Sequence, residues 1–187
     1  MTEPLFELRP MPRHVFVAID FETANYSADS ACALGLVRVE DGIVTDELAL
    51  PIRPPERWFV PRFTALHGIA WEHVAEAPDF AGHYPAIARF AAGAEFLAAH
   101  NAGFDRNVLR ATAARYGLPS LRKRFVCTVR LARAAWNIRP TRLPNVCQTL
   151  GIDLVQHHDA LADARACAAI VARAMAETPA SIERARM

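Results

Sequence analysis

The amino-acid sequence predicts an α/β fold, with a mixed five-stranded sheet that carries helices on both of its faces. The first observation is a series of apolar, β-branched segments near the start, at residues 15–23, 33–40 and 43–50. Asp41 and Gly42 separate the last two segments, and this dipeptide is typical of a tight hairpin turn. The second observation is that strand-like and helix-like segments alternate from residue 78 onwards. An antiparallel meander followed by such alternation is typical of a mixed sheet between helical layers.

The other elements follow from local spacing and from residues that start or stop helices. Four prolines mark residues 51–62 as a loop, and a short helical region follows at residues 63–69. Pro78 and Asp79 are typical of a helix start, and Gly117 ends a helix whose apolar residues recur at helical spacing. We expect helices at residues 79–92, 104–116, 129–136, 145–150 and 159–177, and short strands at residues 95–100 and 125–128.

Length and composition indicate one soluble globular domain. The chain has 187 residues, of which 52% are hydrophobic and 22% charged, and this length is enough to bury a substantial core. We expect the domain to cover residues 14–177, between an N-terminal arm at residues 1–13 and a C-terminal tail at residues 178–187. No apolar run approaches the roughly 18 residues that span a bilayer, and residues 1–12 contain no apolar core of a secretory signal. The four cysteines are too widely spaced for a zinc site, so a cytoplasmic location without membrane contact is expected.

The distribution of charge is more informative than the formal net charge of +1. No acidic residue lies between Asp105 and Asp153, whereas this stretch contains ten basic residues: Arg106, Arg110, Arg115, Arg122, Lys123, Arg124, Arg130, Arg133, Arg139 and Arg142. Such asymmetry indicates a basic surface beside an acidic pocket, which suits a polyanion. The alternative is that these side chains form ordinary solvated helix faces.

Two carboxylates end the first predicted strand. Asp20 and Glu22 are separated by one residue, so they point to the same side of the sheet while Phe21 points into the opposite layer. Neighbouring acids at the end of a core strand repel each other, and a divalent cation such as Mg²⁺ removes that conflict. The alternative is that the strand has already entered a solvated loop.

Further candidate groups lie at two helix starts. Asp105 follows a central strand, and ligands of α/β sheets gather where strands end and helices begin; it could equally be a simple helix-start residue. Asp159 is expected to cap the last helix, which leaves His158 in the preceding loop and places Asp163 in the first turns. One imidazole and one carboxylate can then meet, with His157 and Asp159 as the competing groups.

Taken in order, Asp20, Glu22, Asp105, His158 and Asp163 resemble the signature of the DEDDh 3′→5′ exonucleases. The sequence is similar to the exonuclease domain of the epsilon subunit of bacterial DNA polymerase III, and more distantly to RNase T and oligoribonuclease. The resemblance extends from about residue 14 to residue 176 and includes the segments SACALG (30–35), LHGI (66–69) and HNAGFD (100–105). It implies a ribonuclease H-like fold.

The resemblance also implies a role for each of these residues. The four acids correspond to ligands of two divalent ions, Mg²⁺ or Mn²⁺, and His158 corresponds to the general base. Thr23, Leu66 and His67 match positions that line the pocket for the terminal nucleotide in relatives. Arg139 and Arg142, in a basic loop, are expected to hold the nucleic-acid backbone.

The implied function is a metal-dependent 3′→5′ exonuclease with a proofreading-like or repair-like role. It would act on single-stranded DNA ends and release nucleoside 5′-monophosphates. Two alternatives remain open: trimming of RNA or short oligonucleotides, and a non-catalytic nucleic-acid-binding or polymerase accessory module. The epsilon subunit engages its polymerase through a long C-terminal segment that is not visible in this sequence. We therefore expect a stand-alone enzyme or a chain limited to its catalytic domain, and association with a polymerase is kept as an alternative.

Overall fold

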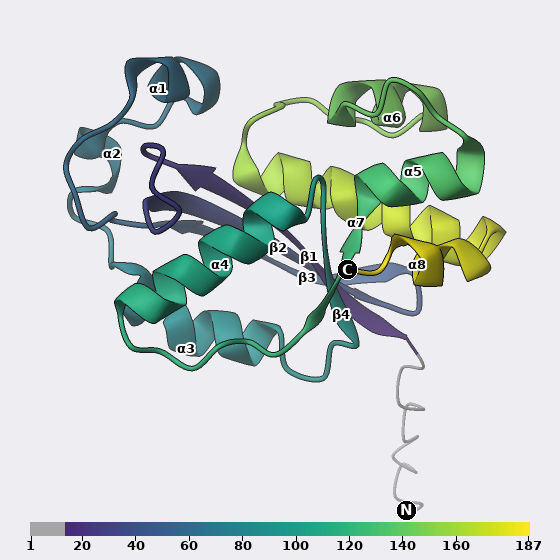
Figure 1. The fold of residues 1–187 in the computed structure, drawn as a ribbon, viewed down its shortest axis with the longest axis horizontal. Coiled ribbons are helices and arrows are strands. Elements are labelled where there is room, and N and C mark those ends of the chain that lie inside the picture. The colour runs from purple at the N-terminus through teal and green to yellow at the C-terminus, as the bar shows by residue number, and fades with distance from the viewer. Residues whose placement is uncertain (1–13) are drawn as a thin grey trace, which may run out of the picture.

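The computed structural model describes residues 14–187, so the predicted arm at residues 1–13 lies outside the described part (Figure 1). In chain order the elements are β1 (Val15–Thr23), β2 (Ala31–Glu40), β3 (Ile43–Pro51), α1 (Pro61–His67), α2 (Trp71–Val74), α3 (Phe80–Phe90), β4 (Phe96–Ala99), α4 (Gly103–Arg115), β5 (Arg124–Cys127), α5 (Thr128–Trp136), α6 (Leu143–Leu150), α7 (Ala160–Glu177) and α8 (Ala180–Ala185). No helix in this part of the chain is long and apolar enough to cross a membrane.

The five strands form one mixed sheet in the order β3-β2-β1-β4-β5. β1 pairs antiparallel with β2, and β2 with β3, which is the predicted meander. β4 adds parallel to β1, and β5 parallel to β4. The prediction of a mixed five-stranded sheet is therefore confirmed, with β1 at its centre between β2 and β4.

Helices cover both faces of the sheet, as predicted (Figure 1). Phe16 and Ala18 of β1 are buried against residues from α5, α6 and α7. Val17, Ile19 and Phe21 point the other way and pack with residues from α3 and α4. Because side chains alternate along a strand, Asp20 and Glu22 belong to the α7 side, and both follow the last core residues there.

Two short helices and two helix starts differ from the sequence-based expectations. α1 covers Pro61–His67 rather than residues 63–69, because Pro61 stands in its first turn. α2 falls in a stretch that carries no strong helix signal. α6 begins at Leu143 rather than 145, because Pro144 stands in the first turn, where a missing backbone N–H costs nothing. The segment expected to be a tail contains α8, whose Ile182 and Ala185 are buried. The backbone N–H of Met187 then donates to the Phe125 carbonyl at 2.9 Å, so this segment packs along β5.

The first turn of α7 lies directly on β2 at Gly35. A Cβ atom at this position would stand 2.2 Å from the carbonyl oxygen of Ala160 and 2.5 Å from the Leu161 nitrogen. Real Cβ atoms do not approach backbone atoms so closely, so only glycine permits this contact. Gly35 is also the cross-strand partner of Asp20. The contact therefore places the start of α7 beside the end of β1.

Replacing Gly35 with alanine should push the first turn of α7 away from β2. Overpacking of this kind typically costs about 1–3 kcal/mol, and the close backbone atoms favour the upper part of that range. Urea unfolding of Gly35→Ala against wild type measures the loss. Gly103→Ala is the control, because its added methyl group meets only the flexible end of Met187 at 3.8 Å. Equal stability of Gly35→Ala and wild type would show that α7 has room to move.

Candidate active site

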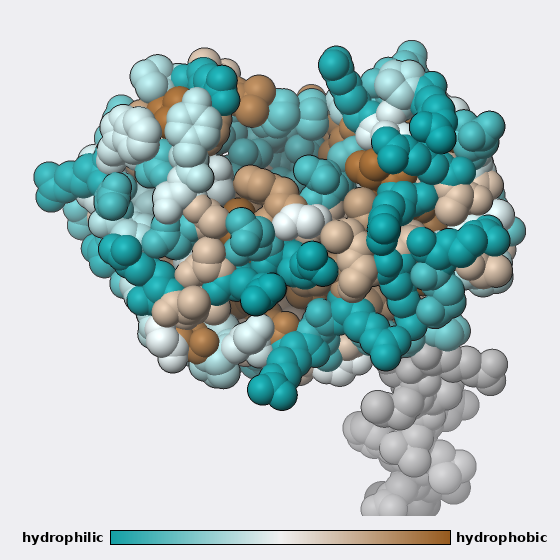
Figure 2. All heavy atoms as spheres, in the orientation of Figure 1, coloured by the Kyte–Doolittle hydropathy of each residue, from teal (hydrophilic) through white to brown (hydrophobic). Residues whose placement is uncertain are grey.

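A cleft of about 910 Å³ opens where β1 and β4 end. Its lining residues come from β1, α1, the β4–α4 turn, the α5–α6 loop and the loop before α7. Figure 2 shows the surface hollowed between the part that carries α1 and α2 and the part that carries α6. The carboxyl ends of parallel strands are the usual place for ligand sites in α/β sheets.

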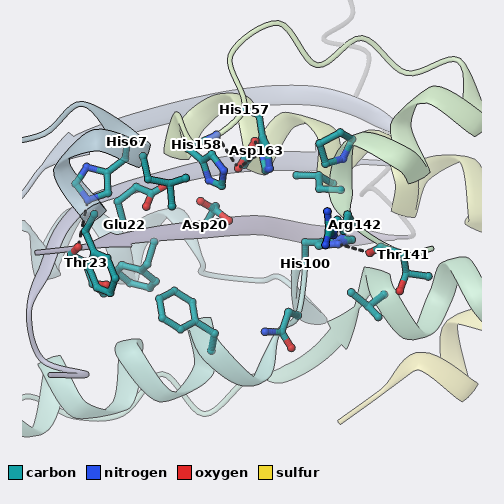
Figure 3. A pocket seen from close by; sticks show the side chains of 18 of the residues that line it. Asp20, Glu22, Thr23, His67, His100, Thr141, Arg142, His157, His158 and Asp163 are labelled. Atoms are coloured by element: carbon teal, nitrogen blue, oxygen red, sulfur yellow. Dashed lines mark hydrogen bonds and ion pairs between the residues drawn. The ribbon is translucent and has the colours of Figure 1, made fainter. Parts of the chain in front are cut away.

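Three carboxylates meet in this cleft. Oxygen atoms of Asp20, Glu22 and Asp163 lie within 4.8 Å of one another, although two of these residues come from β1 and the third from α7 (Figure 3). Glu22 and Asp163 are buried, at 9% and 4% exposure. The strand alternation and the α7 contact at Gly35 together account for this meeting.

Asp105 lies behind Asp20 at the start of α4. It is 1% exposed, and its Oδ1 accepts a hydrogen bond of 3.0 Å from the backbone N–H of Phe21. Its second oxygen, Oδ2, is buried without a hydrogen-bond partner in the described part of the chain. A buried polar atom without a partner costs about 1–3 kcal/mol, so this oxygen indicates a place for a cation or its water.

The acids are held in an environment that disfavours their ionised forms. Burial raises the pKa of Glu22 to about 8, and the charges of Asp163 and Asp105 add to this effect. Burial also raises the pKa of Asp105 to about 7, against the hydrogen bond from Phe21. The pKa of Asp20 is raised well above its ordinary value by burial and then by the charge of Asp105. A cluster of hard oxygen donors in this state fits a divalent cation, since such a cation would favour all the ionised forms at once.

Two adjacent imidazoles approach Asp163 from the loop before α7. Asp159 caps the helix as expected, because its side chain accepts from the Ala162 N–H. His158 has a φ of +72°, and its ring stacks on that of His157 with centroids 3.7 Å apart. His157 Nδ1 lies 3.0 and 3.1 Å from the two Asp163 oxygens, whereas His158 contributes its backbone N–H at 3.2 Å. Both rings line the cleft.

The protonation of His158 suits a proton acceptor. Burial is the main cause that lowers the pKa of His158, and the charge of His157 lowers it further. The charge of Asp163 raises it. A neutral imidazole at neutral pH can take a proton from a water molecule.

The wall on the α1 side contains all three residues that the resemblance assigned to the terminal-nucleotide pocket. The Nδ1 atom of His67 accepts from the Ile69 N–H at 3.1 Å, so its Nε2 carries the hydrogen and donates to the Thr23 carbonyl at 3.2 Å. Burial lowers the pKa of His67, in keeping with a neutral ring. Leu66 is 53% exposed at the mouth of the cleft.

The opposite wall contains one of the two predicted arginines. Arg142 is exposed and lines the cleft, whereas Arg139 is exposed but is not a lining residue. The role of Arg139 stays a prediction. The wall also contains His100 and Asn101 of the HNAGFD segment, and no role was predicted for the histidine. Their position directly after a strand whose end faces the cleft was the available signal.

Comparisons with known proteins agree with this site. Residues 17–171 match the family described as Exonuclease. The chain is 29% identical over 160 residues to a PolC-type DNA polymerase III of Thermotoga petrophila (strain ATCC BAA-488 / DSM 13995 / JCM 10881 / RKU-1), a match that covers 84% of this chain and 12% of that protein. It is 31% identical over 164 residues to Exodeoxyribonuclease 10 of Escherichia coli (strain K12), a match that covers 82% of this chain and 65% of that protein. The chain thus spans less than two thirds of these relatives.

Solved structures show the same fold. Exonuclease X in complex with 5′ overhanging duplex DNA superposes with a TM-score of 0.75 at 26% identity, over 91% of this chain and 96% of that one. The nuclease domain of 3′hExo, a DEDDh family member bound to rAMP, gives a TM-score of 0.76 at 17% identity. The match covers 88% of this chain and 92% of that one. The predicted ribonuclease H-like fold and the resemblance to DEDDh exonucleases are confirmed. The chain belongs to the Exonuclease family of enzymes.

Proposed function

We propose that this chain is a metal-dependent 3′→5′ exonuclease that hydrolyses the terminal phosphodiester bond of single-stranded DNA and releases nucleoside 5′-monophosphates. The observation that carries the proposal is the buried acid cluster at the base of an open cleft, with its raised pKa values and the unpaired oxygen of Asp105. Few functions other than cation binding account for so many buried carboxylates in one place.

Asp20, Glu22, Asp105 and Asp163 would hold two divalent ions, Mg²⁺ or Mn²⁺. When bound, such ions stabilise charge on the attacking and leaving oxygens of a phosphodiester. The acids themselves keep these charges close to a polyanion, and their burial excludes bulk water. Asp20, at the end of β1, would be the ligand that lies near all three other acids.

His158 is the proposed general base. Its lowered pKa leaves the ring neutral near pH 7, and its position in the loop before α7 allows the ring to turn over the acids. His157 is the competing imidazole, since its ring contacts Asp163 in this structure. In this proposal His157 holds Asp163 and His158 moves the proton.

The walls of the cleft suit a single strand that enters with its 3′ end first. The side with Thr23, Leu66 and His67 would receive the terminal sugar and base. Arg142, with Arg139 further along the same loop, would bind the phosphates behind it. DNA is the favoured substrate because the names of several relatives refer to DNA, whereas RNA is the alternative, favoured by the rAMP-bound neighbour.

The wider role is proposed on the same basis. A proofreading-like or repair-like activity agrees with the PolC-type relatives, and these relatives also suggest association with a polymerase.

We place the catalytic unit at residues 14–177, with α8 packed against it. Four buried free thiols suit a reducing cytoplasm. A non-catalytic module would not need every catalytic position of the signature filled.

The direct test uses DNA and RNA strands labelled at either end, with Mg²⁺, with Mn²⁺ and with a chelator. Degradation should start at the 3′ end, release 5′-mononucleotides and stop in chelator. DNA should be degraded faster than RNA of the same sequence. Endonucleolytic fragments as first products, or activity that persists in chelator, would contradict the proposal.

The raised pKa values predict how the stability of the metal-free protein depends on pH. Between the ordinary pKa of a glutamate and the value of about 8 for Glu22, the folded state binds more protons than the unfolded state. The free energy of unfolding should therefore fall as pH rises through this window. Glu22→Gln should flatten the curve and stabilise the metal-free protein at pH 8 by roughly 1–3 kcal/mol.

Thermal unfolding in chelator between pH 4.5 and pH 8.5 measures this effect. The exposed Glu76→Gln is the control and should follow the wild type. Added Mn²⁺ should stabilise wild type at pH 8 much more than Glu22→Gln. A wild type that gains stability as pH rises would show that the acids are not destabilising in the folded state.

The two adjacent histidines can be separated by kinetics. His158→Ala should lower turnover by roughly 10²–10⁴-fold, the range for a lost general base, and remove the acidic limb of the pH–rate profile. Mn²⁺ affinity, measured by calorimetry, should change little. His157→Ala should keep the acidic limb. If His157→Ala removed that limb and His158→Ala preserved it, the two roles would be reversed.

A further inference from the structure

His100 joins three elements at the edge of the cleft. It follows β4 directly, and its Nδ1 lies 2.8 Å from the hydroxyl oxygen of Thr128, the first residue of α5. Its Nε2 lies 2.8 Å from the carbonyl oxygen of Thr141, in the loop before α6 (Figure 3). A carbonyl oxygen can only accept, so Nε2 carries the hydrogen and Nδ1 accepts from Thr128. Both ring nitrogens of His100 are therefore engaged in hydrogen bonds.

This arrangement leaves the His100 ring no free nitrogen for chemistry. Burial lowers the pKa of His100, in keeping with the neutral form that these two hydrogen bonds require. To accept a proton or bind a cation, the ring would have to break the bond with Thr128. The two bonds instead connect the sheet, through β4, to the loop between α5 and α6.

The Thr141 carbonyl belongs to the peptide group that also contains the Arg142 nitrogen. A peptide group is planar and rigid, so a bond to the carbonyl fixes the direction in which the chain enters Arg142. A second contact holds the same residue, because Arg133 Nη2 donates to the Thr141 hydroxyl at 3.0 Å. Arg142 itself is the N-cap residue of α6, where its carbonyl accepts from the Val146 N–H at 3.1 Å. Its backbone position therefore depends on its neighbours.

The Arg142 side chain is available for a ligand. It is exposed, it lines the cleft, and it forms no ion pair with any carboxylate in residues 14–187. It lies on the wall opposite Thr23 and His67 (Figure 3). An unpaired guanidinium at this place suits a phosphate of the strand that enters the cleft.

We propose that His100 is a positioning residue for substrate binding: by holding the Thr141–Arg142 peptide, it aims the Arg142 guanidinium at the phosphate backbone of the bound strand. His100 acts through Arg142 and not on the scissile bond. This inference rests on the proposed function, and it adds a determinant of strand affinity on the α5–α6 side of the cleft.

Two variants of similar polarity separate the two hydrogen bonds of His100. The amide of an asparagine reaches the position of Nδ1, so His100→Asn keeps the bond to Thr128 and loses the bond to Thr141. The amide of a glutamine reaches the position of Nε2, so His100→Gln keeps the bond to Thr141. Both side chains keep the polar character of the site, and thermal unfolding checks that each variant folds.

The experiment is a double-mutant cycle with Arg142→Gln. Affinity for a 5′-fluorescein-labelled DNA strand is measured by anisotropy in chelator, where the strand stays intact, over a series of salt concentrations. His100→Asn should weaken binding by about tenfold, within the range for directly coupled residues, and reduce the salt slope by about 0.7, the value for one phosphate contact on a single strand. In the Arg142→Gln background it should have almost no further effect.

The kinetics and the second variant complete the test. With Mg²⁺ present, KM of His100→Asn should rise in parallel with Kd while kcat stays close to that of wild type. His100→Gln should bind more tightly than His100→Asn. The inference is overturned if His100→Asn weakens binding equally in both backgrounds, if kcat falls with Kd unchanged, or if the two His100 variants bind alike. If wild type degrades DNA normally but His100 and Arg142 are not coupled in the cycle, only the inference is contradicted. If wild type neither binds nor degrades the strand, the proposed function and the inference are both contradicted.

Discussion

The contact between Gly35 and the first turn of α7 sets the spacing on which the site depends. β1 carries Asp20 and Glu22, and β2 runs beside it with Gly35 opposite Asp20. Because no side chain separates β2 from the backbone of Ala160, α7 starts within reach of β1, and Asp163 stands one turn further along. The alanine-rich face of α7, with Ala164, Ala168 and Ala174 fully buried, extends the same close packing along the sheet. Small residues at the interface thus bring distant acids together.

This close packing has an electrostatic cost. Three acids meet at the end of the core and Asp105 is buried behind them. Burial raises the pKa of Asp20, Glu22 and Asp105, so in the folded metal-free protein the protonated forms of these groups are favoured. The Asp105 Oδ2 atom, which has no hydrogen-bond partner in the described residues, adds to that cost. A divalent cation reverses the balance, because each ionised carboxylate then gains a partner. Stability and metal binding are therefore linked, and the site is built for its ligand at the expense of the metal-free state.

The two walls of the cleft differ in chemistry and in the way they are held. On the α1 side, His67 uses both ring nitrogens for backbone bonds, and Leu66 presents an exposed apolar side chain. On the α5–α6 side, the surface carries Arg142, which has no ion-pair partner within residues 14–187, on a loop that His100 and Arg133 hold. An apolar wall suits a base and a sugar, and a cationic wall suits phosphate, so one strand can satisfy both walls at once. Two histidines of similar protonation thus have parallel structural tasks on opposite sides.

The sequence by itself determined the features that depend on local order. Strand alternation put Asp20 and Glu22 on one side of β1, Asp159 marked the start of α7, and the order of the acids indicated the family. Tertiary structure alone decided which groups touch. It bonded Asp105 to the backbone of Phe21, bonded the ring of His157 rather than that of His158 to Asp163, brought Arg142 but not Arg139 into the cleft, and packed α8 along β5. These contacts join residues far apart in the chain or depend on how one loop folds back. Periodicity and capping act over a few neighbouring residues, so they do not encode such contacts.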